Sequence, residues 1–523
     1  MINICKKTIP TAPILTAKQM RKADQYTIDH GGLSAAELME RAGQAVAKAC
    51  QQHKLDSGRI VIIIGAGNNA GDGLVAARLL REQRMPVTVI PLLPFHKFNT
   101  CASDQIALAK KAGVKIRPIN HAGDLPKLKA WLSRAVIVVD AIFGTGLTRA
   151  VTGWLAEAIE HINQAHCPIL SVDIASGIHA DSGKLLGMAI KAGITLPITA
   201  YKWGYWLQQG SAHAGLICAP ATIGICPETI HNILENDAAT VKSYLIAMPL
   251  IQQAFPQRPA QAFKQRFGHL WIFGGSEGYT GAPKLAAMGA QAVGTGLVSI
   301  ACPRDVYSII AASSLEAMVH PQEHADSHQA NAVVAGCGWN QSSQEKLTDI
   351  LRWDIPAILD AQALNMLSQH ESLYNILKNR GAVTVLTPHV GEAARLLKMK
   401  PADIQEDRVT AALALVDQYH AWVVLKGAQT LIVSPQKQLW LNPFGSVNLA
   451  TAGTGDVLAG MIGGLLATGI AADIAIPAAV GLHGLAGEQA NWHRAGQLEA
   501  MIANQLQTIR SRIRRQAQSP LRL

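Results

Sequence analysis

The chain has 523 residues, and its 46 basic against 36 acidic side chains give a net charge of +10 with the histidines neutral. A hydrophobic content of 49% is too high for a disordered protein, and the 45 glycines show no three-residue period, which excludes a collagen-like chain. At roughly 100–200 residues per domain, the length predicts about two to four domains.

Part of the basic excess lies near the C-terminus, where five arginines occur with no acid among them. A terminal arginine run can bind nucleic acid or an anionic surface, but no nucleic-acid-binding motif accompanies this one. We interpret it as a solvated helix end and tail, and expect neither a nucleic-acid nor a membrane partner. These residues are Arg510, Arg512, Arg514, Arg515 and Arg522.

The cysteines and the apolar runs indicate a cytoplasmic protein. Eight cysteines with no CxxC spacing are typical of unpaired thiols in a reducing compartment. Residues 1–10 contain no apolar segment typical of a secretory signal. Two uncharged apolar runs, 285–303 and 457–472, are interrupted by glycines and fall short of a membrane span, so we predict buried helices there.

Short β-branched runs, each followed by a glycine-rich turn and a helical stretch, recur along the chain. Continuous apolar strands alternating with helices predict parallel sheets covered on both faces, with ligands bound beyond the carboxyl ends of the strands. The main runs lie at residues 59–65, 135–140, 168–173, 269–274, 332–336 and 422–426.

A break in the pattern predicts two unlike domains. A strand-like stretch at 215–225 ends before a segment rich in Pro and Asn, and a new strand begins at His269. We therefore expect one domain over residues 1–235 and another over 236–523.

The first half contains a glycine-rich motif, GAGNNAGDG, at residues 65–73, between a predicted strand and a helical stretch at 74–80. It includes the dinucleotide fingerprint GxGxxA, whose glycines let a helix N-terminus approach a pyrophosphate. A nicotinamide dehydrogenase should also place an acid after the next strand. Here that strand, 86–90, runs into PLLP without one, so simple hydride transfer is disfavoured.

Two carboxylates follow later strands of the same half. Asp140 ends AVIVVD and Asp173 ends ILSVD, and both lead into glycine-containing turns. At one sheet edge they could converge with an asparagine of the glycine motif on a cation or a polarised substrate. Each alone could instead be a helix N-cap.

These motifs resemble the epimerase domain of the NAD(P)H-hydrate repair enzymes, from LMERAG at 38–43 through VVDAIFGTGL and VDIASG to Lys202–Gly204. The resemblance implies a Rossmann-like domain that interconverts the R and S forms of hydrated NADH or NADPH. It implies a potassium ion held by Asn69, Asp140 and Ser176, whose oxygens suit a hard cation, and a proton-transfer role for Asp173. The implied substrate contacts are Asn68, Asn69, Ala70, Gly71, Asp72, Gly144, Thr145, Gly146, Leu147, Thr148, Arg149, Ala150 and Asp173.

Three positions depart from this family's pattern. Ala70 replaces the usual Gly, Ala175 replaces Pro, and Pro197-Ile198 replaces a common Thr-Phe pair. An alanine would strain a positive φ angle at position 70, so we expect a remodelled loop and a weakened epimerase.

The second half carries GTGD at residues 453–456, directly before a long apolar stretch. Glycines at a helix N-terminus present backbone N–H groups to an anion, and a neighbouring carboxylate can take a proton from an attacking hydroxyl during phosphoryl transfer. Asp456 could otherwise be an ordinary helix N-terminal charge. TPHVGE at 387–392 adds His389, which alone would be interpreted as structural.

With GGSEGYTGAPKLAA at 274–287, TPHVGE and GTGDVLAG in this order, residues 264–487 resemble the ribokinase-like, ADP-dependent NAD(P)H-hydrate dehydratase. The whole chain thus resembles the bifunctional bacterial repair enzymes, and we expect a cytoplasmic homo-oligomer of class α/β, with a Rossmann-like parallel-sheet domain before a ribokinase-like α/β domain. ADP would phosphorylate the ring hydroxyl, with Asp456 as base and substrate contact and Mg²⁺ on the phosphates. The implied hydrate contacts are Ala282, Gly338, His389 and Asp456, and the implied nucleotide contacts are Lys426, Gly427, Ala428, Gln429, Thr430 and Gly455.

This half also departs from its family. GCGWN at 336–340 replaces GPGLG, Gln362 replaces an acid of DADA, and Lys284 stands at a usually apolar position. Two alternatives therefore stay open: a ribokinase-like small-molecule kinase, and a nucleotide sensor without turnover.

A histidine-rich segment could suggest a further metal site. Its spacing matches no familiar zinc motif, so we interpret it as a solvated loop. The residues are His320, Glu323, His324, Asp326 and His328.

Overall fold

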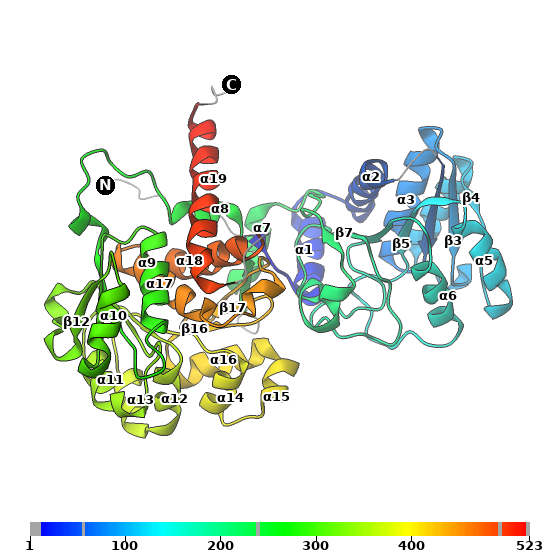
Figure 1. Cartoon of the computed structure of the whole chain (residues 1–523). Coiled ribbons are helices and arrows are strands. Elements are labelled where there is room, and N and C mark those ends of the chain that lie inside the picture. The colour runs from blue at the N-terminus through cyan, green and yellow to red at the C-terminus, as the bar shows by residue number, and fades with distance from the viewer. Residues whose placement is uncertain (1–11, 55–57, 237–240, 490–493, 519–523) are drawn as a thin grey trace. The chain divides into compact units, whose positions relative to one another are not determined.

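The computed structural model describes residues 12–54, 58–236, 241–489 and 494–518 (Figure 1). The chain forms two compact units that divide between Thr240 and Val241, and Ala12 is grouped with the second. The boundary expected at 235/236 falls inside helix α7 (Pro227–Asn236), a few residues before this division.

The N-terminal unit is built on a seven-stranded sheet in the order β4-β3-β2-β5-β6-β7-β8, and every neighbouring pair is parallel. Its central strands are continuous apolar runs, as parallel strands buried on both faces require. The strands are β2 (Arg59–Ile64), β3 (Val87–Pro91), β4 (Lys115–Ile116), β5 (Ala135–Ala141), β6 (Ile169–Val172), β7 (Ile194–Leu196) and β8 (Leu216–Ile217).

Helices pack against this sheet because alternate strand side chains point to opposite faces. Ile60, Ile62 and Ile64 join the core formed with helices α2, α3 and α4, and Val61 and Ile63 are equally buried on the other face. The helices of the unit are α1 (Ala17–His30), α2 (Ala35–His53), α3 (Asn68–Glu82), α4 (Thr100–Lys111), α5 (Leu125–Leu132), α6 (Trp154–Asn163) and α7.

The prediction of a strand over residues 215–225 is wrong. The stretch 215–225 is not a long strand, since only Leu216 and Ile217 pair with β7. Beyond Ile217 only an isolated parallel bridge between Ala221 and Ile198 follows, and Ile223 and Ile225 pack into the core from irregular structure. Apolar β-branched residues indicated burial here but not strand pairing.

The C-terminal unit contains an eleven-stranded sheet in the order β1-β9-β18-β17-β16-β15-β14-β13-β10-β11-β12. Its pairs from β12 to β16 are parallel, whereas β16–β17 and β17–β18 are antiparallel. The strands are β1 (Ala12–Pro13), β9 (Lys242–Leu245), β10 (His269–Phe273), β11 (Leu297–Cys302), β12 (Met318–Pro321), β13 (Ala332–Ala335), β14 (Ala357–Leu359), β15 (Thr384–Leu386), β16 (Trp422–Leu425), β17 (Leu431–Val433) and β18 (Gln438–Leu441).

Both faces of this sheet are covered. Leu270 and Ile272 of β10 lie in the core with the apolar helices, and Trp271 and Phe273 are buried on the opposite face. Figure 1 shows helices α14, α15 and α16 side by side in this unit. The helices are α8 (Met248–Gln253), α9 (Ala282–Ala292), α10 (Tyr307–Ser313), α11 (Gln344–Leu351), α12 (Gln362–Gln369), α13 (Glu371–Lys378), α14 (Val390–Leu397), α15 (Pro401–Glu406), α16 (Arg408–Tyr419), α17 (Thr454–Ala467), α18 (Ala472–Gly487) and α19 (Leu498–Gln518).

The two apolar runs have different outcomes. The run 457–472 falls largely in the buried helix α17, as predicted. The run 285–303 is not one helix: it ends α9, turns at Gly294 with a φ of 91°, and continues as strand β11. Within the described residues, no helix combines the length and hydropathy needed to cross a bilayer.

The structure also bears on the predictions made for the cysteines and for the C-terminal arginines. Every described cysteine is free, as the spacing predicted. Arg510 lies in α19, in keeping with the predicted helix end, and Arg522 falls outside the described residues.

Candidate functional sites

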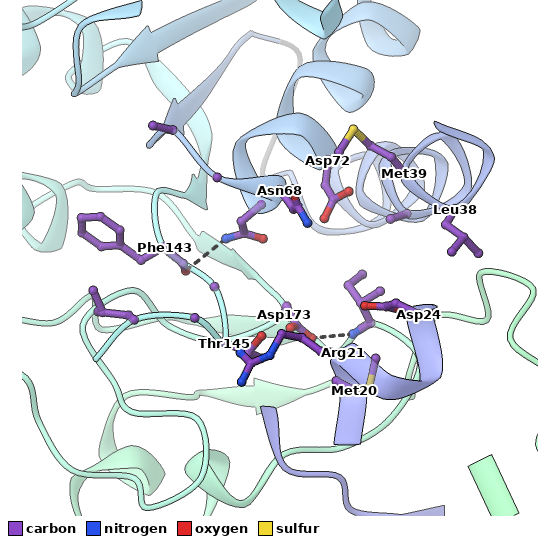
Figure 2. Close-up of a pocket in the computed structure, with 18 of the residues that line it drawn as sticks. Met20, Arg21, Asp24, Leu38, Met39, Asn68, Asp72, Phe143, Thr145 and Asp173 are labelled. Atoms are coloured by element: carbon purple, nitrogen blue, oxygen red, sulfur yellow. Dashed lines mark hydrogen bonds between the residues drawn. The ribbon is translucent and has the colours of Figure 1, made fainter. Parts of the chain in front are cut away.

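A cavity of about 620 Å³ opens at the carboxyl edge of the N-terminal sheet. Figure 2 shows that Asp24, Asp72 and Asp173 reach it from three different elements. Of the predicted substrate contacts, Ala70, Gly71 and Ala150 are not among its lining residues. Those that line it are Asn68, Asn69, Asp72, Gly144, Thr145, Gly146, Leu147, Thr148, Arg149 and Asp173.

The glycine motif is a helix start rather than a loop. Helix α3 begins at Asn68, and its N-cap Gly67 makes no side-chain cap hydrogen bond. The strain predicted for Ala70 is wrong, because this residue lies in the first turn of α3 and does not have a positive φ. Its side chain is fully buried in the N-terminal core, so Ala70 is accommodated within a regular helix.

Asp140, Ser176 and Asn69 meet in one hydrogen-bond network. The Ser176 hydroxyl donates to Asp140 Oδ1 at 2.5 Å, and the Asn69 amide donates to the Phe143 carbonyl at 3.1 Å. Ser171 Oγ and the Ser176 backbone N–H donate to the other oxygen of Asp140 at 2.7 and 2.9 Å. Burial raises the pKa of Asp140, and these hydrogen bonds lower it.

This donor set fits a hard monovalent cation. Asp140 is fully buried, and no ion pair with a basic residue is found for it among the described residues. The Asn69 amide directs its nitrogen to Phe143, which leaves its oxygen available. The Asp140 carboxylate, the Ser176 hydroxyl and the Asn69 amide oxygen together offer three oxygen-bearing side chains, which match the ligand preference of such ions.

Asp173 is held by a buried lysine. Lys202, which is fully buried, donates from Nζ to Asp173 Oδ1 and to the Ile198 carbonyl, the latter at 2.7 Å. The Ile198 N–H donates to the same carboxylate oxygen at 2.9 Å, and Tyr205 Oη donates to the Asp173 carbonyl at 2.6 Å. Asp173 also has a φ of 64°, unusual for a residue other than glycine. The structure thus fixes this carboxylate tightly at the cavity wall.

Sequence reasoning missed the contribution of α1 to this cavity. Arg21 and Asp24 both line it, although no motif marks either residue. Burial raises the pKa of Asp24 to about 6, and Lys202 opposes the effect. Burial and the nearby carboxylates of Asp173 and Asp24 raise the pKa of Asp72 well above its usual value. The amphipathic pattern of α1 was the available signal, but it does not identify the cavity that its polar residues face.

In the C-terminal unit, Asp456 lies in the first turn of α17. The N-cap, Gly453, has a φ of 91° and makes no side-chain cap hydrogen bond, so the helix terminus keeps the anion-binding character predicted for it. Burial and the carboxylate of Asp360 raise the pKa of Asp456 to about 7, while hydrogen bonding to Cys337 and the charge of Lys426 oppose the rise.

Lys426 links this acid to two others. Its Nζ donates to Asp360 Oδ1 at 2.7 Å and lies 3.9 Å from Glu392 Oε2. These partners raise the pKa of Lys426 against the effect of burial. A Cβ on Gly455 would lie 3.3 Å from this Nζ. The predicted residues Lys426, Gly455 and Asp456 are therefore brought together.

The motif GCGWN at residues 336–340 has two glycines with positive φ angles. Gly336 and Gly338 have φ angles of 114° and 71°, a region open to glycine at little cost. Cys337 is buried and hydrogen-bonded with Asp456. A Cβ at Gly338 would meet that of Ala282 at 3.0 Å, so these two predicted hydrate contacts are adjacent.

The other two departures, Gln362 and Lys284, have hydrogen-bond partners other than Asp456. Gln362 begins α12 and accepts a hydrogen bond from Asn365 at 3.0 Å, while Asp360 binds Lys426. Lys284 donates to Ser313 at 2.8 Å on an exposed surface. Asp360, the acid that remains in the motif at 360–363, is the one that accepts the hydrogen bond from Lys426.

His389 has a structural contact of its own. Its Nδ1 accepts a hydrogen bond from the Gly391 N–H at 3.0 Å, which caps α14, and the His389 backbone N–H donates to Glu392 Oε2 at 2.8 Å. Its side chain is 55% exposed and lies beside Glu392. Burial and the charge of Lys426 lower its pKa, which favours the neutral ring.

The nucleotide-contact prediction at 426–430 falls on the turn between β16 and β17. Sequence reasoning missed its support, the buried Arg408 at the start of α16. Arg408 donates to the carbonyls of Leu425 at 3.1 Å and Gln429 at 3.3 Å, and to that of Ala428. Thr430 Oγ1 closes the turn on the Gly427 carbonyl at 3.1 Å.

Replacing Arg408 by Met should raise the nucleotide KM about tenfold or more while changing kcat less. Several backbone carbonyls would lose a charged donor, and each such loss costs about 1–3 kcal/mol. Steady-state kinetics at varied nucleotide concentration would measure the effects on KM and on kcat separately. Arg395→Met, which removes an exposed arginine that donates to Asn365, is the matched control. An unchanged KM would contradict the role given to Arg408.

The histidine-rich segment does not gather into a metal cluster. Glu323 pairs with Arg304 at 2.5 Å. Within the described residues, the group with metal-ligand proximity is Cys337, Asp360 and Asp456, whose ligand atoms lie within 4.8 Å of one another. Asp360 and Asp456 offer the hard oxygen donors that suit Mg²⁺, whereas the thiol does not.

Fold and clusters together define a two-unit α/β protein with an acid-lined cavity in one unit and a helix-terminal acid beside a buried lysine in the other. Two family models match it: one described as YjeF-related protein N-terminus over residues 35–204, and one described as NAD(P)H-hydrate dehydratase over residues 270–511. The chain belongs to the family of bifunctional NAD(P)H-hydrate repair enzymes.

Membership rests on similarity along nearly the whole chain. The bifunctional NAD(P)H-hydrate repair enzyme Nnr of Moorella thermoacetica is 34% identical over 94% of this chain and 95% of that protein. Its counterpart in Coxiella burnetii is 33% identical over 90% and 94%. The solved ADP/ATP-dependent NAD(P)H-hydrate dehydratase of Bacillus subtilis, co-crystallised with ATP and Mg²⁺, is 29% identical over 51% of this chain and 98% of its own, with a TM-score of 0.45.

The comparisons and the structure confirm the predicted family and the predicted α/β fold class, with a parallel sheet in the N-terminal half. They also confirm that the chain is an enzyme with two joined activities. The kinase and sensor alternatives are not favoured.

Proposed function

We propose that the C-terminal unit, residues 241–523, dehydrates the S form of hydrated NADH or NADPH at the expense of ADP. One observation carries this proposal: Asp456, with a pKa of about 7, lies in the first turn of α17 beside Lys426. A carboxylate with such a pKa is a base matched to neutral pH, and the helix terminus and the lysine attract a phosphate.

Hydroxide is a poor leaving group, so the ring hydroxyl must first be activated. Asp456 takes the hydroxyl proton as the oxygen attacks the terminal phosphorus of ADP, and the phosphorus–oxygen bond to AMP breaks. The phosphorylated hydrate then loses phosphate and a ring proton, which restores the reduced nicotinamide. The turn at 426–430 and Gly455 would hold the nucleotide, and Ala282, Gly338 and His389 the hydrate.

Magnesium would neutralise phosphate charge during this transfer. Its ligands would be phosphate oxygens and the hard oxygen of Asp360, which Lys426 already binds. Lys426 itself donates to the anion as a point charge.

For the N-terminal unit, residues 13–240, we propose interconversion of the R and S hydrates in the acid-lined cavity. Its support is the convergence of the predicted contacts from Asn68 to Asp173 on one space. Asn69, Asp140 and Ser176 would hold a potassium ion that orders the cavity wall. Asp173, fixed by Lys202, would accept a proton at the hydrated ring.

A two-epimer recovery assay tests both proposals. With ADP and the S hydrate, absorbance of the reduced nicotinamide should return, and AMP and phosphate should appear in equal amounts. Added R hydrate should be recovered faster than its spontaneous epimerisation allows, and removal of potassium should slow only this step. A stable phosphorylated product instead of reduced nucleotide would contradict the dehydratase proposal. ATP run in parallel decides the donor.

We also propose that the enzyme works in the cytoplasm as a homo-oligomer. The free state of every described cysteine is compatible with a reducing compartment. Analytical ultracentrifugation would measure the oligomeric state.

A further inference from the structure

Helix α1 brings one acid to the cavity from outside the segment that the family model covers, which begins at residue 35. The helix is firmly placed: Thr16 and Gln19 form a capping box, and the Ala17 N–H donates to Asp181 at 2.7 Å. Met20 and Asp24 are one helical turn apart, and both line the cavity. Asp24 is therefore presented by a fixed element rather than by a loop.

The three carboxylates that face this cavity differ in whether they have an ion-pair partner among the described residues. The carboxylates that face it are Asp24, Asp72 and Asp173, and the cations are Arg21 and Arg149, with Lys202 behind the wall. Lys202 is bonded to Asp173, which leaves Asp24 and Asp72 in a partly buried space with a neighbouring negative charge. Such an arrangement favours the protonated form of a carboxyl group.

We propose that Asp24 is the general acid of epimerisation, protonating the ring hydroxyl of the hydrate; this inference rests on the epimerase function proposed above. The Asp24 proton moves to the hydroxyl oxygen, the carbon–oxygen bond breaks, and water leaves with the bonding electrons. The ring nitrogen shares its lone pair with the carbon to form an iminium. Water then adds to the opposite face, its proton passes to Asp173, and exchange with water in the cavity returns a proton to Asp24.

Asp24 suits this step better than Asp72 does. The pKa of Asp24 is raised by burial to about 6, close to neutral, so the group both holds and releases a proton during turnover. Burial and the neighbouring carboxylates raise the pKa of Asp72 well above its usual value, which disfavours release of its proton during turnover. Asp173, paired with Lys202, is the acceptor.

The test compares Asp24→Asn with Asp29→Asn in the full-length enzyme. Asp29 lies on the same helix, is exposed and accepts a hydrogen bond from Gln25 at 2.8 Å, so its substitution matches the charge change outside the cavity. We expect Asp24→Asn to lower the enzymatic epimerisation rate about 100-fold or more, with dehydration of pure S hydrate unchanged. Asp29→Asn should leave both rates within about twofold of the wild type.

A pH profile separates an acid from a merely structural residue. In the wild type, the epimerisation rate above the spontaneous rate should fall as the pH rises through about 6, because the acid form is lost. Asp24→Asn should lose this limb of the profile, that is, the fall of the rate as the pH rises. Asp24→Glu should restore both part of the rate and the limb. A rate for Asp24→Asn within threefold of the wild type, or a limb that persists in it, overturns the inference. A wild type that dehydrates but does not epimerise overturns the proposed function of this unit itself.

Discussion

Replacing Asp456 by asparagine is expected to lower the rate of dehydration by about 10³-fold or more, because the hydroxyl would lose its proton acceptor at the moment of attack. Nucleotide binding should weaken little, since Lys426 and the N-terminus of α17 remain. Recovery of reduced-nicotinamide absorbance from the S hydrate, together with nucleotide binding by calorimetry, would measure the two effects separately.

Asp473→Asn is the control for this variant. Asp473 is an acid in the first turn of the next helix, α18, so the substitution tests the loss of a helix N-terminal charge alone. The wild-type dehydration rate should rise with pH through about 7 and then level off, because the base must be ionised and burial raises the pKa of Asp456 to about 7. Residual activity in Asp456→Asn that keeps this profile would contradict the assignment.

Replacing Lys202 by methionine should destabilise the N-terminal unit by about 3 kcal/mol, the lower end of the range for breaking a buried ion pair. Lys202 is fully buried, and the Asp173 side chain is 15% exposed, so the variant leaves a poorly solvated charge without its partner. Hydrogen exchange of peptides that contain β6 and β7 would report the opening free energy of this region.

The double variant Asp173→Asn with Lys202→Met separates stability from catalysis. Without either charge, most of the protection from hydrogen exchange that Lys202→Met loses should return. The destabilisation by that variant arises from an unpaired charge and not from missing packing. Epimerisation should stay lost because the proposed proton acceptor is gone. Lys191→Met, at an exposed position before β7, should change neither property. A double variant as unstable as Lys202→Met alone would refute this account of the pair.

Local sequence patterns predicted the elements that carry the chemistry. The runs at 59–65, 135–140 and 422–426 became β2, β5 and β16, because continuous β-branched apolar residues satisfy both faces of a buried parallel strand. GTGD at 453–456 became the first turn of α17, since a glycine at the N-cap and an acid in the first turn are local signals. The family resemblance added which of these residues share a site.

Predictions failed where the outcome depended on contacts distant in sequence. The stretch 215–225 lacks a partner strand beyond Ile217, and the run 285–303 divides into a helix and a strand at a glycine turn. The strain expected at Ala70 assumed a loop, whereas the residue is helical and buried. Hydrophobicity indicates burial in each case, but it does not determine which backbone conformation provides it.

By itself, the sequence determined the class of the fold, the strand ends at which Asp140 and Asp173 stand and the helix start that carries Asp456, because these follow from short-range periodicity and turn chemistry. Only the tertiary structure decided the partners: Lys202 for Asp173, Asp360 for Lys426, and the place of Asp24 in the cavity. Protonation depends on burial and on charges brought together by folding, so the chemical state of each acid is a property of the assembled chain.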